Sequence, residues 1–157
     1  MSDLHPPLRV LIVDDQHLVR SGFAMILSVE DDLEVVGEAE NGRVALAQAR
    51  ALRPDVVLMD VQMPVMDGAE ATRAIRAGRA GEEMRHVPII AMTANAMSRD
   101  RDACLKAGMN DHLGKPIDPD HLLQTIQRWI GSVEPIAGAV IAGAVELPAS
   151  ETIQTMR

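Results

Sequence analysis

The stretch Val56-Val57-Leu58-Met59-Asp60 decides the fold, because four consecutive apolar residues end at a carboxylate. A strand that is apolar on both faces needs to be covered on both sides, as a central strand of a parallel sheet is. Pro54 stops the helical pattern that comes before it. We therefore predict a buried parallel strand with Asp60 at its carboxyl end.

Similar short runs recur on both sides of this strand and alternate with segments of helical spacing. The other predicted strands are Arg9–Val13, Leu33–Ala39, Ile89–Met92 and His112–Gly114. The predicted helices include Val19–Leu27, Ala45–Leu52, Ala71–Ile75, Ser98–Gly108 and Asp118–Ile130. We expect Asn41-Gly42 to form a turn and Gly81-Glu82-Glu83 a solvated loop. The alternation predicts an α/β protein with a (βα)5 doubly wound five-stranded parallel sheet.

The length and composition indicate one globular domain with a modest appendage, since the chain has 157 residues and 47% hydrophobic content. We predict an N-terminal extension over residues 1–7, the domain over residues 8–131, and a low-complexity linker or tail over residues 132–157. The tail carries the repeat of Ile136–Val140 as Ile141–Val145, whose five-residue period fits neither a helix nor a strand.

Charge and hydropathy exclude several partners. The chain has 15 Lys and Arg against 23 Asp and Glu, and this net charge of -8 argues against direct nucleic acid binding. No apolar stretch approaches the roughly 20 residues of a membrane span, so no membrane partner is expected. The single cysteine, Cys104, has no internal disulfide partner, which favours a cytoplasmic location.

Five polar residues follow the predicted strands, each where a buried run passes into a loop. Asp14 and Asp15 follow the first strand, Asp60 the central one and Thr93 the fourth, and Lys115 follows the fifth. The carboxyl ends of parallel strands share one edge of the sheet and form a binding crevice there. This crevice would hold three carboxylates, a hydroxyl and an ammonium group.

Three carboxylates in one crevice repel each other unless a cation is bound between them. Mg²⁺ prefers oxygen ligands and keeps several waters, so we predict Asp15 and Asp60 as ligands, with Asp14 acting through water. Gln62 could add its backbone carbonyl. With Lys115 and Thr93 opposite, Asp60 is predicted to attack phosphorus and become an acyl phosphate.

The same residues lie in motifs that together resemble the receiver domain of the two-component response regulator family over about residues 8–131. The motifs are Val13-Asp14-Asp15, Met59–Pro64 with Met66-Asp67-Gly68, Thr93-Ala94 and Lys115-Pro116. The resemblance implies a flavodoxin-like receiver fold, Mg²⁺ as cofactor and a cis Lys115-Pro116 bond. It also implies that Asp60 takes phosphate from a kinase phosphohistidine while Lys115 and Thr93 hold the phosphoryl group. Such a domain promotes only its own phosphoryl transfer and dephosphorylation.

The segment Gly108–Asp118 most resembles receivers of hybrid sensor histidine kinases, which implies a phosphorelay. The expected partners are a sensor histidine kinase, a histidine phosphotransfer domain or both, and a homodimer stays open. The alternative is a standalone single-domain response regulator that acts by phosphorylation-dependent protein binding. His112 stands where many receivers carry Tyr or Phe, so the aromatic readout of that family is replaced by an imidazole or is absent.

Other classes fit the residues less well. A phosphohydrolase with an aspartyl nucleophile would usually have a second acid two residues on, where this chain has Gln62. A nucleotide-binding domain would need a glycine-rich turn after the first strand, whereas Asp14-Asp15-Gln16 is acidic. A degenerate receiver would lack one or more of the acids, and here all are present.

Overall fold

The computed structural model describes residues 6–94 and 98–131, and within them strands and helices alternate as the sequence predicts. The strands are β1 (Leu8–Val13), β2 (Leu33–Ala39), β3 (Val56–Asp60), β4 (Ile89–Thr93) and β5 (Asp111–Gly114). The helices are α1 (His17–Ser28), α2 (Gly42–Leu52), α3 (Gly68–Arg76), the short 3₁₀ helix η2 (Glu82–Met84), α4 (Ser98–Ala107) and α5 (Pro119–Gly131).

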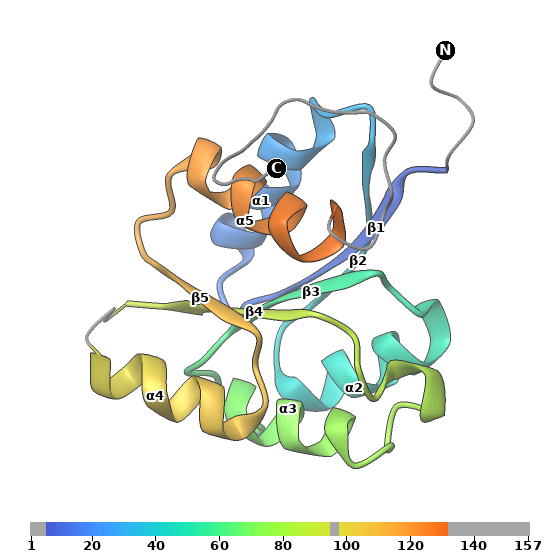
Figure 1. The fold of residues 1–157 in the computed structure, drawn as a ribbon, viewed down its shortest axis with the longest axis vertical. Coiled ribbons are helices and arrows are strands. Elements are labelled where there is room, and N and C mark those ends of the chain that lie inside the picture. Colours follow the sequence, from blue (N-terminus) through green and yellow to red (C-terminus); the bar gives the residue numbers. More distant parts are fainter. Residues whose placement is uncertain (1–5, 95–97, 132–157) are drawn as a thin grey trace. The chain divides into compact units, whose positions relative to one another are not determined.

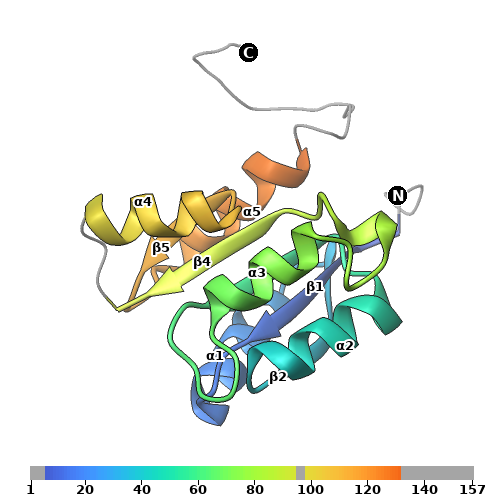
Figure 2. The same cartoon turned by 90° about the horizontal axis from the view of Figure 1, so that it is seen from below.

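The five strands form one parallel sheet in the order β2-β1-β3-β4-β5. Helix α1 and the first turns of α5 cover one face, and α2, α3 and α4 cover the other (Figure 1). Figure 2 shows this second face, with α2 and α3 lying along the sheet. The predicted (βα)5 doubly wound architecture is therefore confirmed.

The chain divides into two compact units, residues 1–125 and residues 126–157, with the boundary inside α5. The second unit contributes only the last turns of α5 to the described structure. Most of the predicted N-terminal extension and the whole predicted tail, including its five-residue repeat, lie outside the described residues. Among the residues that are described, no helix is both long and apolar enough for a membrane span.

Burial explains why β3 and β4 form the centre of the sheet. All five residues of each strand are buried, and so are the last four of β1. These strands continue into one apolar cluster with the inner faces of α2 and α3. A rigid centre of this kind fixes the ends of β1, β3 and β4 relative to one another, and these ends carry the polar residues predicted to form the site.

The loop after β3 folds back tightly onto the strand. Gly68, the first residue of α3, donates its backbone N–H to the carbonyl of Val61 at 2.9 Å. A Cβ at Gly68 would collide with the carbonyl oxygen of Asp60, so only glycine allows this approach. Asp67 caps the helix, accepting from the N–H of Glu70 while the Glu70 side chain accepts from the N–H of Asp67.

Two local predictions were wrong in detail. Asn41-Gly42 is the start of α2 rather than a free turn, because the Asn41 side chain accepts a hydrogen bond from the N–H of Val44 and caps the helix. In the predicted solvated loop Gly81-Glu82-Glu83, both glutamates are exposed as expected, but they belong to the 3₁₀ helix η2. The predicted end of α4 is confirmed, since Gly108 has a φ of 109° directly after the helix.

Candidate functional site

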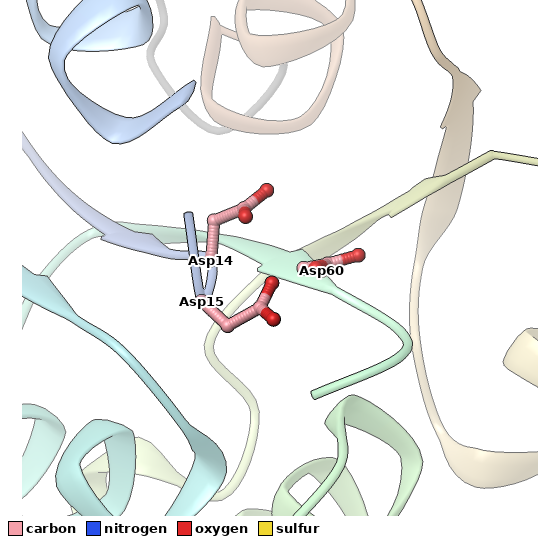
Figure 3. Close-up of side chains that lie close together, drawn as sticks. All are labelled: Asp14, Asp15 and Asp60. Atoms are coloured by element: carbon pink, nitrogen blue, oxygen red, sulfur yellow. The ribbon is translucent and has the colours of Figure 1, made fainter. Parts of the chain in front are cut away.

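Three carboxylates lie together at the carboxyl edge of the sheet, at the ends of β1 and β3 (Figure 3). One oxygen from each of Asp14, Asp15 and Asp60 lies within 4.8 Å of the others. Asp14 is fully buried and Asp60 nearly so, whereas Asp15 is exposed. The structure therefore brings the three predicted acids together, and their oxygens form a donor set that could hold a metal ion.

Lys115 directly follows β5, the edge strand of the sheet, and its side chain reaches the acids from there. Its Nζ lies 2.9 Å from Asp14 Oδ2 and 3.5 Å from Asp60 Oδ1. Its backbone N–H donates to the carbonyl of Thr93 at 2.8 Å, because β5 runs beside β4 with Gly114 paired to Thr93. The register of two neighbouring strands thus places the ammonium group between the two buried carboxylates. The predicted cis Lys115-Pro116 bond is confirmed.

A cavity of about 200 Å³ opens over these groups. Its walls include Asp15, Asp60, Gln62, Thr93 and Lys115, so each predicted site residue except the buried Asp14 lines one space. Asp14 is engaged beneath it, since its carboxylate accepts from the N–H of Gln16 at 2.9 Å as well as from Lys115. The structure therefore brings the predicted site residues together around one cavity.

The electrostatics of the site are dominated by burial. Burial, together with the neighbouring charges of Asp14 and Asp15, raises the pKa of Asp60 to about 6, although Lys115 opposes this rise. For Lys115, burial alone lowers the pKa, but the hydrogen bond to Asp14 and the nearby acids outweigh it and leave the pKa above its usual value. The acids therefore carry uncompensated negative charge that a cation would relieve.

Two further side chains concern the site. Sequence reasoning missed Arg20 of α1, which donates from Nη1 to the carbonyl oxygen of Asp14 at 2.6 Å. The sequence signal that could have indicated this contact is a basic residue about one and a half helical turns after the acidic pair.

His112 is only partly exposed on β5, beside Asp111, with 3.9 Å between His112 Nδ1 and Asp111 Oδ1. Both alternatives for His112, an imidazole in place of the aromatic readout or no such readout, stay predictions.

The fold and the site together define an α/β domain with an acidic crevice at the carboxyl edge of a parallel sheet. Comparison with known proteins identifies the family: residues 10–127 match the response regulator receiver domain. The chain therefore belongs to the receiver domain family of two-component signalling, as its motifs predict. Signalling proteins of this family interact with histidine kinases or phosphotransfer partners.

Individual relatives agree with this assignment. The chain is 41% identical over 139 residues to the sensor protein GacS of Pseudomonas syringae pv. syringae, covering 83% of this chain and 15% of GacS. It is 44% identical over 111 residues to a protein-glutamate methylesterase/protein-glutamine glutaminase of Nocardioides sp., covering 71% of this chain and 30% of that protein. The chain thus spans only a minor part of these relatives.

Among solved structures, the receiver domain of the sensor histidine kinase PA1611 from Pseudomonas aeruginosa PAO1 is similar in both sequence and fold. The identity is 42% and the TM-score 0.71, with 80% of this chain and 98% of that one covered. That structure has a magnesium ion coordinated in its active site cleft. The similarity supports both the receiver fold and its likeness to the receivers of hybrid kinases.

Proposed function

We propose that Asp60 accepts a phosphoryl group from a phosphohistidine and becomes an aspartyl phosphate. The observation that carries this proposal is that Asp60 and Thr93 line the same crevice, with Lys115 Nζ 3.5 Å from Asp60 Oδ1. A carboxylate oxygen of Asp60 would form a bond to phosphorus as the phosphorus–nitrogen bond breaks, and the imidazole nitrogen would keep the electron pair.

The residues of the crevice fit Mg²⁺ as the metal. Asp15 and Asp60 offer carboxylate oxygens, and we assign direct ligation to these two, because both oxygens of Asp14 already accept hydrogen bonds. Gln62 lines the same cavity, and we propose its backbone carbonyl as a further ligand. Magnesium, when bound, supplies positive charge toward the phosphoryl oxygens.

The remaining groups hold the phosphoryl group by charge and hydrogen bonding. Lys115 would donate from Nζ to one phosphoryl oxygen, and the Thr93 hydroxyl would donate to another. Lys115 also lowers the pKa of Asp60, against the stronger effect of burial, and so favours the ionised form that is needed for attack. Phosphorylation would draw Thr93 toward the site and alter the face formed by α4, β5 and α5.

The setting that we propose is a phosphorelay, in which the chain exchanges phosphate with a sensor histidine kinase or a histidine phosphotransfer domain. Leu18 and Met25 of helix α1 and Val29, its C-cap residue, support this proposal, because these apolar residues are 82%, 72% and 74% exposed. Their spacing places them in one row along the helix, and Leu18, in the first turn, is the member of the row nearest to the acidic loop. A row of exposed apolar side chains is suited to packing against a helical partner.

A second candidate is a standalone response regulator that acts through its phosphorylated face. What favours it is the similarity to a protein named a response regulator rather than a sensor kinase, VraR of Staphylococcus aureus, which is 32% identical over 121 residues. The chain covers 56% of VraR, so VraR extends beyond the matched region. Transfer of phosphate from the labelled chain to a histidine phosphotransfer protein would favour the relay. A cytoplasmic location is proposed for either candidate, since Cys104 is the single cysteine of the sequence.

The experiment is labelling of the purified chain with acetyl phosphate and Mg²⁺, followed by intact mass measurement. We expect one added phosphoryl group in the wild type and in Asp31→Asn, which changes an exposed acid in the turn after α1. Asp60→Asn should take up none while keeping its circular dichroism spectrum. Labelling of Asp60→Asn would contradict the assignment of the acceptor.

Docking on α1 has a separate test. Leu18→Glu should slow phosphorylation by a phosphorylated histidine phosphotransfer protein but leave labelling by acetyl phosphate unchanged, because only the protein donor needs the apolar surface. Leu105→Glu is the matched control, since Leu105 is another exposed apolar residue, 46% exposed, on α4. Equal rates for the wild type and Leu18→Glu with the protein donor would contradict docking on α1.

A further inference from the structure

Arg20 of α1 reaches back to the loop that carries the acidic pair. Its Nη1 donates to the carbonyl oxygen of Asp14 at 2.6 Å, and its Nε lies 3.1 Å from Glu38 Oε1 on β2. A third contact joins Nη2 to His17 Nδ1 at 3.4 Å. The side chain is only 13% exposed, so the guanidinium is held from several sides in one orientation.

Arg20 binds the backbone carbonyl of Asp14, and the other polar groups of Asp14 are hydrogen-bonded as well. The backbone N–H of Asp14 donates to the carbonyl of Ala39 at 3.0 Å, and its carboxylate accepts from Gln16 and Lys115. The carbonyl belongs to the peptide unit that leads into Asp15. Fixing this oxygen therefore fixes the direction in which the chain enters Asp15, the one exposed acid of the three.

We propose that Arg20 is a positioning residue for the divalent cation site, acting through the Asp14–Asp15 peptide, and that Glu38 holds Arg20 in place. This inference rests on the metal site of the proposed function. Arg20 contacts no carboxylate of the site in the part of the chain that the structure describes, and its bond is to the main chain. Its effect is to keep the Asp15 carboxylate within reach of Asp60 before the cation binds, which reduces the ordering needed on binding.

Two simpler roles have to be separated from positioning. Arg20 could act by its charge alone, and Arg20→Lys tests this because lysine keeps the charge but loses the planar fork that joins Asp14 to Glu38. Arg20 could also serve only the stability of the fold. Arg9 offers the matched control, since its guanidinium donates to the carbonyl oxygens of Leu52 and Arg53 at the C-terminal end of α2, away from the acidic crevice.

The experiment is titration calorimetry with MgCl₂ on the full chain, with the melting temperature of each variant measured in EDTA. We expect Arg20→Gln to weaken Mg²⁺ binding about tenfold, which is typical when a group that orients a metal ligand is removed. Arg20→Lys should be weakened as well, and Glu38→Gln should shift the affinity in the same direction. Arg9→Gln should bind Mg²⁺ like the wild type even where its melting temperature falls.

Several outcomes would overturn the inference. Wild-type affinity in Arg20→Gln would show that the peptide needs no such support, and full restoration in Arg20→Lys would show that charge alone acts. If Arg20→Gln does not fold, Glu38→Gln, which keeps Arg20, decides the question by its affinity. Absence of Mg²⁺ binding in both the wild type and Arg9→Gln would instead remove the metal site of the proposed function, and this inference with it.

Discussion

Asp60→Asn should stabilise the metal-free protein, and the gain should depend on pH. Burial and the neighbouring acids raise the pKa of Asp60 from its ordinary 3.8 to about 6, so the folded protein resists its ionisation. A group whose pKa is raised by folding contributes stability at low pH and loses it as the pH rises through the folded value. For Asp60 this loss falls between about pH 4 and pH 6.

The magnitude follows from the size of the shift. A rise of about two pKa units corresponds to about 3 kcal/mol at 1.36 kcal/mol per unit. Asparagine resembles the protonated acid in shape and carries no charge, so Asp60→Asn removes this penalty at every pH. Wild type and variant should therefore have similar free energies of unfolding near about pH 4, and the variant should be more stable by about 3 kcal/mol above about pH 7.

Urea unfolding followed by circular dichroism in EDTA, at about pH 4, 6 and 8, measures this difference. Asp31→Asn, a change at an exposed acid, serves as control and should show no comparable pH-dependent gain. A stabilisation that is the same at all three pH values would show that ionisation of Asp60 is not its source. A destabilised variant at the highest pH would refute the electrostatic reasoning itself.

Three other perturbations probe the same site. Mg²⁺ at ten times its dissociation constant should stabilise the wild type by about 1.4 kcal/mol, and Asp15→Asn, which removes a proposed ligand, should show a smaller gain at the same concentration in thermal unfolding. Lys115→Ala should lower the free energy of unfolding at neutral pH by about 2 to 3 kcal/mol, because it leaves the buried Asp14 without its charged partner, yet the variant should still bind Mg²⁺ in calorimetry. Gly68→Ala should displace the loop after β3, because its methyl group would meet the Asp60 carbonyl, and should slow labelling by acetyl phosphate, whereas Gly22→Ala, at an open position on α1, should label at the wild-type rate.

The elements of this fold that could be predicted from sequence are those whose signal is local. The runs ending at Met59 and Met92 are apolar on every residue, and both strands are fully buried. Asn41-Gly42 was harder, because an asparagine side chain can close a turn or cap a helix, and the choice depends on how α2 packs. Gly42 donates its N–H to the carbonyl of Met66 at 2.8 Å, a contact that the local sequence does not contain.

The site shows the same division between local and long-range information. The rule that carboxyl ends of parallel strands converge was enough to bring Asp14, Asp60 and Lys115 together. It did not predict that Lys115 lies closer to Asp14, 101 residues away, than to Asp60. That preference arises from the register of β5 on β4 and from the depth at which Asp14 is buried, both of which depend on the packed sheet.

This closer pairing has a consequence for how the site would respond to phosphorylation. Lys115 is already bonded to a fully buried carboxylate, so a phosphoryl group on Asp60 would have to compete with Asp14 for the same ammonium group. Without a divalent cation to screen Asp14, that competition favours the existing pair, because the buried acid would otherwise be left unpaired. Cation binding and recruitment of Lys115 are therefore expected to be coupled, and the metal would matter for holding the phosphoryl group as well as for its transfer.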